Sequence, residues 1–380
     1  MKILFGVSSV GLGDVRRSLE VANRLRRLGD YEIEWASSEP TISFLLNKEE
    51  RVLPICSKLK SLSEAMESRV SHGRLDDISR VARSSSALGK ENYQFLKPHL
   101  GNYDALVQDE FVETMFSFMW DKWPPLPKKR VVITDYFQFE TGSRNPFSRI
   151  VTWYANRMLV KAYNNSQLRI FADSVDFIPK KIPKFEIVGP ILEQTPPESR
   201  EELGRKLFPG KSGIVIVVSV GGTSVGKYLL DFFVSNQKSF LAALDSTLVL
   251  LLGPRIDRSQ YQQDSENLVL VPFTPDALAY FKAADCVVAQ AGGSTLNEIA
   301  SMGTPCVTIP IKNHWEQEAS AKTFSEKCGF KIVQFDEVST ESLVTAINSA
   351  INSKYEPMRS NGAEVAATLI SNYLKSGEGN

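Results

Sequence analysis

The sequence lacks an apolar run of about 20 residues, the length that a membrane-spanning helix needs. Residues 1–7 are too few, and too soon followed by serine and glycine, for a signal peptide, and we interpret them as a buried strand. The four cysteines have no CxxC spacing, and His72, His99 and His314 have no metal-ligand spacing. We therefore expect a soluble, cytoplasmic protein with reduced thiols and without a metal or other cofactor.

The chain also lacks net charge, because its 44 Lys and Arg residues balance its 44 Asp and Glu residues. The two signs are nevertheless unevenly placed. Residues 1–185 hold 28 basic against 22 acidic side chains (+6), and residues 186–380 hold 16 against 22 (−6). This asymmetry favours two domains and an anionic partner for the N-terminal half, with no indication of a nucleic-acid partner. A chance imbalance on solvated faces is the alternative.

Short apolar runs alternate with helix-period segments along the chain, which is typical of parallel βα units. A Pro- and Gly-dense stretch interrupts this pattern near its middle. We predict an α/β protein with a Rossmann-like domain at 1–188, a linker at 189–200 and a second Rossmann-like domain at 201–360. A C-terminal helix and tail at 361–380 could pack on either domain. The expected strands are residues 2–8, 31–36, 105–109, 130–135, 168–172, 214–220, 247–252, 268–271, 286–289, 306–310 and 331–335.

The most informative motif follows the expected strand 286–289. Gly292 and Gly293 let a ligand approach the backbone, and Ser294 and Thr295 are expected to cap the helix that follows. The first-turn amides and the helix dipole then form a phosphate site. Glu298, one turn further on, could accept hydrogen bonds from a ribose diol. A capping box between Ser294 or Thr295 and Glu298 is the alternative.

These residues, together with 299–310 and 316–319, resemble the donor-binding signature of inverting GT-B glycosyltransferases. The resemblance is strongest to the MurG-like proteins of family 28, which are related to family 1, and it covers roughly residues 219–329. It implies the GT-B fold, with two doubly wound Rossmann-like domains facing a cleft. In the N-terminal half, the resemblance is confined mainly to the first βαβ unit.

By this resemblance, Glu298 would hold the ribose of a nucleoside diphosphate sugar, with uridine diphosphate as the default nucleotide. Thr295 and the amides from Gly292 to Ser294 would hold the pyrophosphate, while Glu316 and Gln317 would hold the sugar. Phe273 would line the base pocket.

Gln290 departs from this family, in which a phosphate-binding His or Arg is usual at its position. A neutral amide can donate a hydrogen bond but brings no charge. Retaining GT-B enzymes typically have Glu at this position, so Gln290 favours inversion at the anomeric carbon.

A second glycine-rich turn, Gly221-Gly222-Thr223, follows the expected strand 214–220. Through Lys227 it also fits the GxxxxGK pattern of a P-loop. Tyr228 comes next, where a P-loop needs Ser or Thr for Mg²⁺. The resemblance favours a donor-phosphate turn over a P-loop NTPase.

The N-terminal turn contains Gly11, Gly13 and Asp14 between a strand and a helix at 15–28. The related enzymes have an active-site His where this chain has Asp14, so this loop is expected on the acceptor side. Asp14 could serve as the catalytic base, and Asp109 and Asp135, at other strand ends, are reserve candidates. The alternative is that Asp14 only caps the helix.

A basic and aromatic stripe recurs every four residues at Arg149, Trp153, Arg157 and Lys161. Such a helix could lie on an anionic membrane surface, or it could simply cover a core. The MurG-like enzymes act on polyprenyl-linked acceptors at the membrane. Further aromatic and apolar residues lie nearby at Phe116, Phe118, Met119, Trp120 and Trp123.

The predicted function is therefore transfer, with inversion, of a hexose or N-acetylhexosamine from a nucleoside diphosphate sugar to a hydroxyl or lipid-linked acceptor. The alternatives are a hydrolysing UDP-sugar 2-epimerase-like enzyme, a P-loop-type NTPase and a non-catalytic nucleotide-sugar-binding protein.

Overall fold

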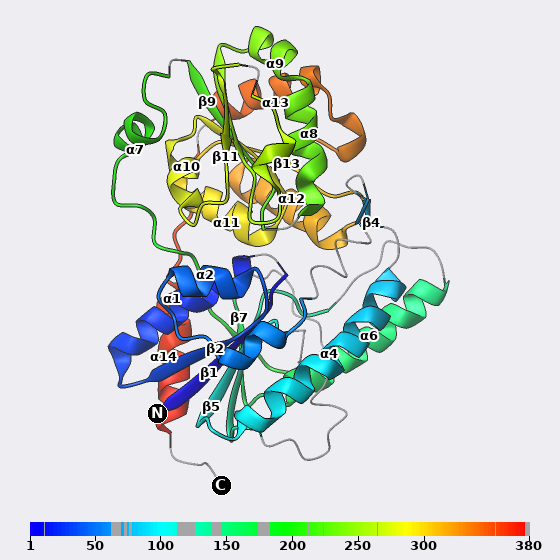
Figure 1. Cartoon of the computed structure of the whole chain (residues 1–380), viewed down its shortest axis with the longest axis vertical. Helices are drawn as coiled ribbons and strands as arrows, with labels where there is room; N and C mark the ends of the chain where they lie inside the picture. Colours follow the sequence, from blue (N-terminus) through cyan, green and yellow to red (C-terminus); the bar gives the residue numbers. More distant parts are fainter. Residues whose placement is uncertain are drawn as a thin grey trace. The chain divides into compact units, whose positions relative to one another are not determined.

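A computed structural model of the chain describes residues 1–10, 12–61, 70–71, 74–75, 78–111, 126–138, 146–173, 183–211, 213–222, 224–263, 265–353 and 355–376. The chain forms two compact units (Figure 1). The first comprises residues 1–66, 77–193 and 360–380, and the second comprises residues 67–76 and 194–359. The chain thus leaves the first unit within the stretch predicted as a linker and returns to it for the C-terminal helix.

The first unit is built on a six-stranded parallel sheet with the order β2-β1-β5-β6-β7-β8. The five strands predicted for this half are all present, within a residue or two of their expected ends. The strands are β1 (Lys2–Val7), β2 (Glu32–Ala36), β5 (Ala105–Asp109), β6 (Lys129–Thr134), β7 (Leu168–Phe171) and β8 (Glu186–Ile187). The helical elements are α1 (Gly13–Leu28), α2 (Thr41–Asn47), η1 (Pro54–Lys58), α4 (Ile78–Leu100), α6 (Pro146–Asn164) and α14 (Gly362–Lys375).

The C-terminal helix α14 packs on the first unit, which answers the question that the sequence left open. Arg24 of α1 donates to Glu364 across 2.6 Å. Lys129 Nζ lies 2.7 Å from the carbonyl oxygen of Ser376 and so stabilises the carbonyl end of the helix. Figure 1 shows α14 beside α1.

Gly362, the first residue of α14, lies against the chain segment that precedes the crossing to the second unit. A Cβ atom at Gly362 would lie 2.4 Å from the Pro190 carbonyl oxygen and 2.6 Å from that of Gly189. We expect Gly362→Ala to destabilise the first unit by about 1–3 kcal/mol, because the backbone must shift to admit the methyl group. Gly204→Ala in α7 (Arg200–Leu207) is the matched control, since nothing lies within 4 Å of its added Cβ. The urea concentration at half-unfolding, detected by limited proteolysis, is measured for both variants. Equal midpoints of the two variants would contradict this expectation.

The second unit repeats the architecture, with the strand order β11-β10-β9-β12-β13-β14 and only parallel pairs among its described strands. All six strands predicted for this half are present. They are β9 (Ile214–Ser219), β10 (Ser246–Leu251), β11 (Leu268–Val271), β12 (Cys286–Gln290), β13 (Cys306–Ile309) and β14 (Lys331–Ile332). A short antiparallel pair, β3 (Val70–Ser71) with β4 (Arg74–Leu75), is assigned to this unit as well.

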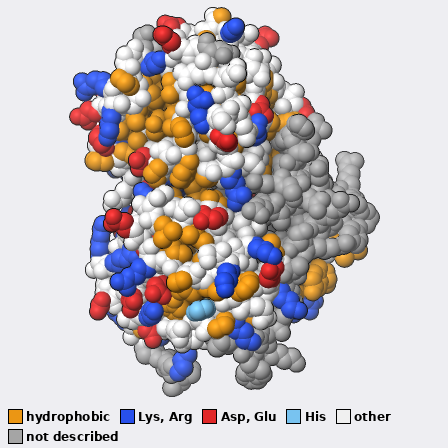
Figure 2. All heavy atoms as spheres, viewed as in Figure 1, with side chains coloured by type: hydrophobic (Ala, Val, Ile, Leu, Met, Phe, Trp, Pro, Cys, Tyr) orange, Lys and Arg blue, Asp and Glu red, His pale blue; other side chains and the backbone are white. Residues whose placement is uncertain are grey.

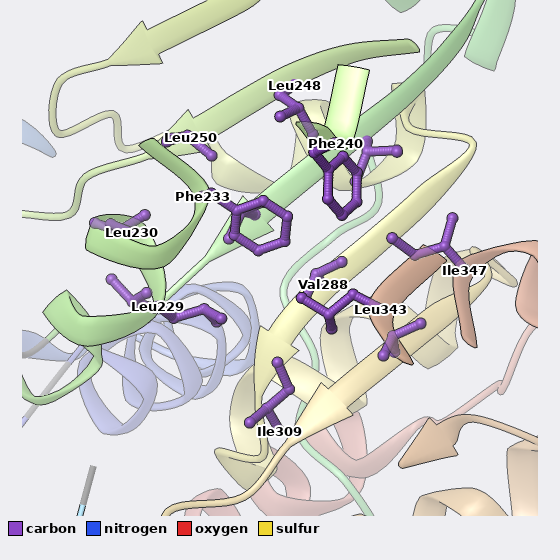
Figure 3. Packing of buried hydrophobic residues seen from close by; sticks show 14 of the residues in the cluster. Leu229, Leu230, Phe233, Phe240, Leu248, Leu250, Val288, Ile309, Leu343 and Ile347 are labelled. Atoms are coloured by element: carbon purple, nitrogen blue, oxygen red, sulfur yellow. The ribbon is translucent and has the colours of Figure 1, made fainter. Parts of the chain in front are cut away.

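Helices cover both faces of this second sheet. On one face Val218 packs in a cluster with Phe233 and Leu343. Figure 3 labels Phe233 and Leu343 in this cluster. On the other face Val217 packs with Leu296 and Phe324. Adjacent strand residues therefore point into two separate cores, which is why these strands are apolar without alternation. The helical elements are α7, η3 (Ser224–Gly226), α8 (Lys227–Ser235), α9 (Gln237–Ala243), η4 (Arg258–Gln260), α10 (Ala277–Ala283), α11 (Gly293–Met302), α12 (Trp315–Cys328), η5 (Phe335–Glu337) and α13 (Thr340–Ile351).

The four cysteines are free thiols, as predicted, and Cys56, Cys286 and Cys306 are buried. Burial raises the pKa of Cys56 to about 11 and that of Cys286 to about 12. Both thiols therefore stay protonated near neutral pH and act as small apolar core residues.

Charged side chains of both signs are interspersed among the described residues on the face shown in Figure 2. On that face the uneven charge of the two halves of the sequence is thus spread over the surface and does not gather in one patch.

Candidate functional site

The second unit has a topological switch point between β9 and β12. The chain continues from β9 to β10 and β11 on one side, and then crosses to β12, β13 and β14 on the other. Ligands of doubly wound sheets bind outside the carboxyl ends of the strands at such a point. The turn with Gly221 and Gly222 follows β9, and the turn with Gly292 follows β12. The structure thus brings together the two glycine turns that the sequence predicts as donor-binding.

Close backbone packing joins the loops at this edge of the sheet. Gly221 and Gly253 each have φ +75°, a conformation that glycine adopts without strain. A Cβ atom at Gly253 would lie 2.7 Å from the Gly221 carbonyl oxygen, so the loops after β9 and β10 contact each other. A Cβ atom at Gly226 would lie 2.8 Å from Cδ of Gln290, so η3 packs on the end of β12. Three strand ends therefore converge.

Helix α11 begins two or three residues earlier than expected. Its N-cap is Gly292, which has no side chain, and no side-chain cap is made there. The prediction that Ser294 and Thr295 cap the helix is therefore wrong, because both already lie in the first turn. The capping-box alternative with Glu298 is wrong for the same reason.

The consequence is an N-terminus suited to an anion. The first backbone hydrogen bond of the helix is made by Leu296, whose N–H donates to the Gly292 carbonyl oxygen at 3.0 Å. The amides of residues 293–295 precede it and point away from the helix, together with the positive end of the helix dipole. Residues 292–295 and Glu298 are all partly exposed. The segment therefore offers backbone donors for a phosphate, with a carboxylate one turn further along.

Gln290 ends β12 and is 6% exposed. Its carboxamide lies against Gly226 of η3, and among the described residues no group pairs with its Nε2. A buried amide donor without a partner costs free energy unless a ligand or water accepts from it. Gln290 is therefore a neutral donor at the end of β12.

Glu316 and Gln317 lie in the first turn of α12, which follows β13, the neighbour of β12. Gln317 Oε1 accepts from the Ile311 N–H at 3.1 Å, and so shapes the loop after β13. His314 caps the helix, and burial lowers its pKa, which keeps it a neutral acceptor. Glu316 is exposed at the same edge of the sheet.

Phe273, which was predicted to line the base pocket, follows a strand that is not adjacent to β9 or β12. Phe273 is partly exposed after β11, which is separated from β9 by β10. Thr223 lies outside the described residues, as does Gly11 of the N-terminal loop.

The Lys227 side chain contacts Asp231 and so does not have the arrangement of a P-loop lysine. It is the first residue of α8, and its Nζ lies 2.7 Å from Asp231 Oδ1 and 5.2 Å from the Tyr261 ring centroid. The carboxylate one turn further along the helix therefore holds the ammonium group. A P-loop lysine has to reach the β- and γ-phosphates instead.

The first unit has its own switch point, between β1 and β5, and there the structure shows a buried ion cluster. Asp14 is the second residue of α1, whose N-cap is Leu12. The alternative that Asp14 caps the helix is therefore wrong. Gly13, predicted to lie in the loop, is the first residue of this helix.

Arg17 is the centre of this cluster, and no motif in the sequence singles it out. Its guanidinium is 5% exposed and contacts carboxylates from three elements. The contacts are Asp14 Oδ1 at 3.1 Å, Asp109 Oδ1 at 2.6 Å, Glu110 Oε1 at 3.2 Å and Asp135 Oδ2 at 2.8 Å. The acids at the ends of β5 and β6 were the available signal, because the carboxyl ends of parallel strands meet at one edge.

The exposure of the cluster increases from its centre outwards. Asp109 is 0% exposed, Glu110 13%, Asp14 15% and Asp135 26%. Burial and the nearby Asp135 and Asp14 raise the pKa of Glu110 well above its usual value. Burial opposes ionisation of Asp135, but Arg17 and Glu110 together lower its pKa.

Oxygen atoms of Asp14, Asp109 and Glu110 lie within 4.8 Å of one another, a spacing that could hold a cation. Arg17 Nη2 contacts all three of these side chains. The guanidinium therefore already neutralises the place that a metal ion would take.

Helix α6 presents the basic and aromatic stripe predicted from the sequence. Ile150, Trp153 and Tyr154 are 63%, 61% and 57% exposed. The Arg157 guanidinium lies 5.8 Å from the centroid of the Trp153 ring. Arg149, Arg157 and Lys161 are exposed as well, whereas the aromatic residues at 116–123 lie outside the described residues. Among the described helices, none has the length and apolarity to cross a membrane.

Comparison with known proteins finds a family match in the C-terminal half of the chain. Residues 215–373 match the family model of the glycosyltransferase family 28 C-terminal domain. The chain is 27% identical over 227 residues to an uncharacterized glycosyltransferase of Methanopyrus kandleri, covering 58% of this chain and 64% of the relative. It is also 27% identical over 192 residues to the UDP-N-acetylglucosamine–N-acetylmuramyl-(pentapeptide) pyrophosphoryl-undecaprenol N-acetylglucosamine transferase of Caldanaerobacter subterraneus subsp. tengcongensis, covering 47% and 50%. The matches thus span less than two thirds of these curated relatives.

Among solved structures, the chain is similar to the spinosyn rhamnosyltransferase SpnG complexed with thymidine diphosphate, with a TM-score of 0.58 and 13% identity. The superposition covers 98% of this chain and 96% of that one. At this identity the likeness shows the fold, which is that of the GT-B glycosyltransferases.

Proposed function

Because this chain is a MurG-like member of the GT-B glycosyltransferases, with a family 28 C-terminal domain, we propose that it transfers a hexose or N-acetylhexosamine from a nucleoside diphosphate sugar to a hydroxyl acceptor. The observation that carries this proposal is the uncapped N-terminus of α11 at the switch point of the second unit. Its amides and dipole suit the diphosphate, which takes on negative charge as it leaves.

The donor is held by groups at neighbouring strand ends in this proposal. Glu298 accepts from the ribose hydroxyls, and the backbone from Gly292 to Thr295 donates to the pyrophosphate. Gln290 adds its unpaired amide donor, and Glu316 with Gln317 orients the sugar. Uridine diphosphate is the nucleotide that we favour, because the Caldanaerobacter relative is named for a UDP sugar. No metal ion is required in this proposal, since the positive end of the α11 dipole stabilises the negative charge of the diphosphate.

The acceptor side lies in the first unit, where Asp14 takes the proton of the attacking hydroxyl. The acceptor oxygen then bonds to the anomeric carbon from the side opposite the diphosphate, and the configuration inverts. A neutral Gln290 suits inversion, because it places no carboxylate beside the sugar.

One contact in the structure and two measurable outcomes separate glycosyl transfer from the alternative functions. The Lys227–Asp231 contact argues against a P-loop NTPase. A hydrolysing epimerase would release free sugar without an acceptor, and a sensor would bind the donor without turnover.

Calorimetric titration of the wild type with UDP-, dTDP- and GDP-sugars tests the proposal. We expect binding of one nucleoside diphosphate sugar, and turnover when acceptors are added. If none of these nucleotides binds, the donor site is wrongly assigned.

We further propose that α6 brings the protein to an anionic membrane, where a polyprenyl-linked acceptor would be found. Trp153 and Tyr154 supply exposed aromatic surface, and Arg149, Arg157 and Lys161 supply positive charge. The Caldanaerobacter relative is named for an undecaprenol acceptor, which is consistent with this location.

The double variant Trp153→Glu/Tyr154→Glu is expected to bind phosphatidylglycerol vesicles at least about tenfold more weakly, since each aromatic side chain contributes about 1.5–3 kcal/mol on burial. Vesicle sedimentation measures the effect. Leu46→Glu is the control, because Leu46 is also 56% exposed but lies on α2. Equal sedimentation of the double variant and the wild type would remove α6 from this role.

A further inference from the structure

We propose that Arg17 is a positioning residue for proton removal: it keeps Asp14 ionised and in a fixed orientation among the strand-end carboxylates of the first unit. The inference rests on the proposed function, in which Asp14 accepts the proton of the acceptor hydroxyl. Arg17 acts through Asp14 and through the charge of the cluster.

The geometry of the guanidinium shows why only arginine suits this position. Nη2 contacts Asp14, Asp109 and Glu110, while Nη1 contacts Asp135 at 2.8 Å. Nε donates to the second oxygen of Asp109 at 3.0 Å, which completes a two-point contact with that carboxylate. All three nitrogen atoms are thus used, and the planar fork fixes the direction of each contact.

One member of the cluster carries a proton. Glu110 Oε1 accepts from the Asp135 amide at 2.9 Å, from Thr134 Oγ1 at 3.1 Å and from Arg17 Nη2 at 3.2 Å. Because Oε1 is filled by donors, the proton belongs on Oε2. Burial and the neighbouring Asp135 and Asp14 raise the pKa of Glu110 well above its usual value, so we place the proton of the cluster on this acid.

The remaining charges give the cluster a surplus of negative charge. Asp14 and Asp135 already outnumber the single positive charge of Arg17, and Asp109, whose pKa burial raises, is held by Arg17 and Ser18. Asp109 has no exposed surface, so only Asp14 and Asp135 can meet an acceptor.

Other titratable groups around the cluster keep their own charge state. Arg16, next to Arg17 on α1, is paired with Glu193 at 2.6 Å. Burial raises the pKa of Tyr163 on α6 well above its usual value, so its hydroxyl stays neutral beside Thr134. The charge that changes in the reaction is therefore that of the Arg17 cluster.

The reaction step draws on this surplus. The acceptor oxygen bonds to the anomeric carbon, the bond from that carbon to the diphosphate oxygen breaks, and the electron pair leaves with the diphosphate. The hydroxyl proton moves to Asp14, and the cluster loses one negative charge. Arg17 supports this step in two ways: it keeps the carboxylate ionised beforehand and holds it in line with the hydroxyl.

Arg17→Lys tests the inference, with Arg26→Lys as the matched control on the same helix, where Arg26 pairs with Glu50. A lysine keeps the charge but cannot reach all four side chains. We expect kcat to fall about 100-fold, the cost of a small misplacement of a catalytic group. The acidic limb of the kcat/KM profile moves to higher pH, because fewer contacts stabilise the ionised carboxylates. Donor affinity and the Arg26→Lys profile stay at the wild-type values.

A folded Arg17→Lys protein with the wild-type pH profile and kcat would overturn the role of Arg17.

Infrared spectroscopy of the wild type provides a second measurement that needs neither activity nor the arginine variant. We expect the carbonyl stretch of a protonated carboxyl group at neutral pH, which Glu110→Gln removes. Absence of that band, or its persistence in Glu110→Gln, would overturn the assignment of the proton. The infrared result does not depend on whether a nucleotide sugar binds. The Arg17→Lys comparison is made only once the wild type turns over a nucleotide sugar, so failure of the proposed function is seen in the wild type and failure of this inference only in the variant.

Discussion

Asp14→Asn is expected to abolish sugar transfer while leaving donor binding at the wild-type level. Asparagine cannot accept the hydroxyl proton, and loss of a general base lowers kcat by about 10²–10⁴-fold. The fold should tolerate the change, because Arg17 keeps its contacts with Asp109, Glu110 and Asp135. Initial rates of transfer at saturating donor, with calorimetry for donor affinity, measure the two quantities separately.

Asp30→Asn is the matched control, since Asp30 is an exposed aspartate at the far end of α1. Unchanged turnover of Asp14→Asn would remove Asp14 from its role as base. Asp135, 26% exposed in the same cluster, would then be the next candidate, whereas Asp109 has no surface to offer an acceptor. The same rates measured on Asp135→Asn decide between them.

Glu298→Ala is expected to weaken donor binding by about 10–100-fold. A carboxylate that accepts from ribose hydroxyls makes charge-assisted hydrogen bonds, each contributing about 1.5–3 kcal/mol. Titration with the nucleoside diphosphate alone should show the same loss, because the carboxylate contacts the ribose and not the sugar.

The affinity for the uncharged nucleoside should fall by the same factor, whereas the affinity for inorganic pyrophosphate should be the same in Glu298→Ala and the wild type. Glu326→Ala is the control, with Glu326 on α12 66% exposed in its contact with Lys322. Equal affinities of Glu298→Ala and the wild type would show that α11 does not hold the ribose. The phosphate site at its N-terminus would then need a separate test.

Much of the fold could be predicted from the sequence, because its signals are local. Strand β5 has the predicted bounds, and the other predicted strands agree within a residue or two except β14, which ends at Ile332, three residues before its predicted end. Unbroken apolar runs such as Ile214–Ser219 also predicted strands covered on both faces. The two glycine turns after β9 and β12 were predicted in the same way, since glycines directly after a buried strand reflect the backbone conformation required there.

The ends of helices were predicted less well. Ser294 and Thr295 look like caps in the sequence, but α11 already begins at Gly293. Leu12, and not Asp14, precedes α1. Both helices start earlier than their polar residues suggest, because the turn after each strand decides where the first helical residue lies.

The sequence by itself determined the order of strands and helices, the two α/β units and the glycine turns, because each depends on residues close together in the chain. Only the tertiary structure decided that α14 packs on the first unit and that Arg17 gathers carboxylates from α1, β5 and β6. The charge state of Glu110 belongs with these, since it depends on burial and on partners about 25 to 95 residues away in sequence. Such electrostatic effects arise from distance in space, which the residue pattern along one strand or helix does not contain.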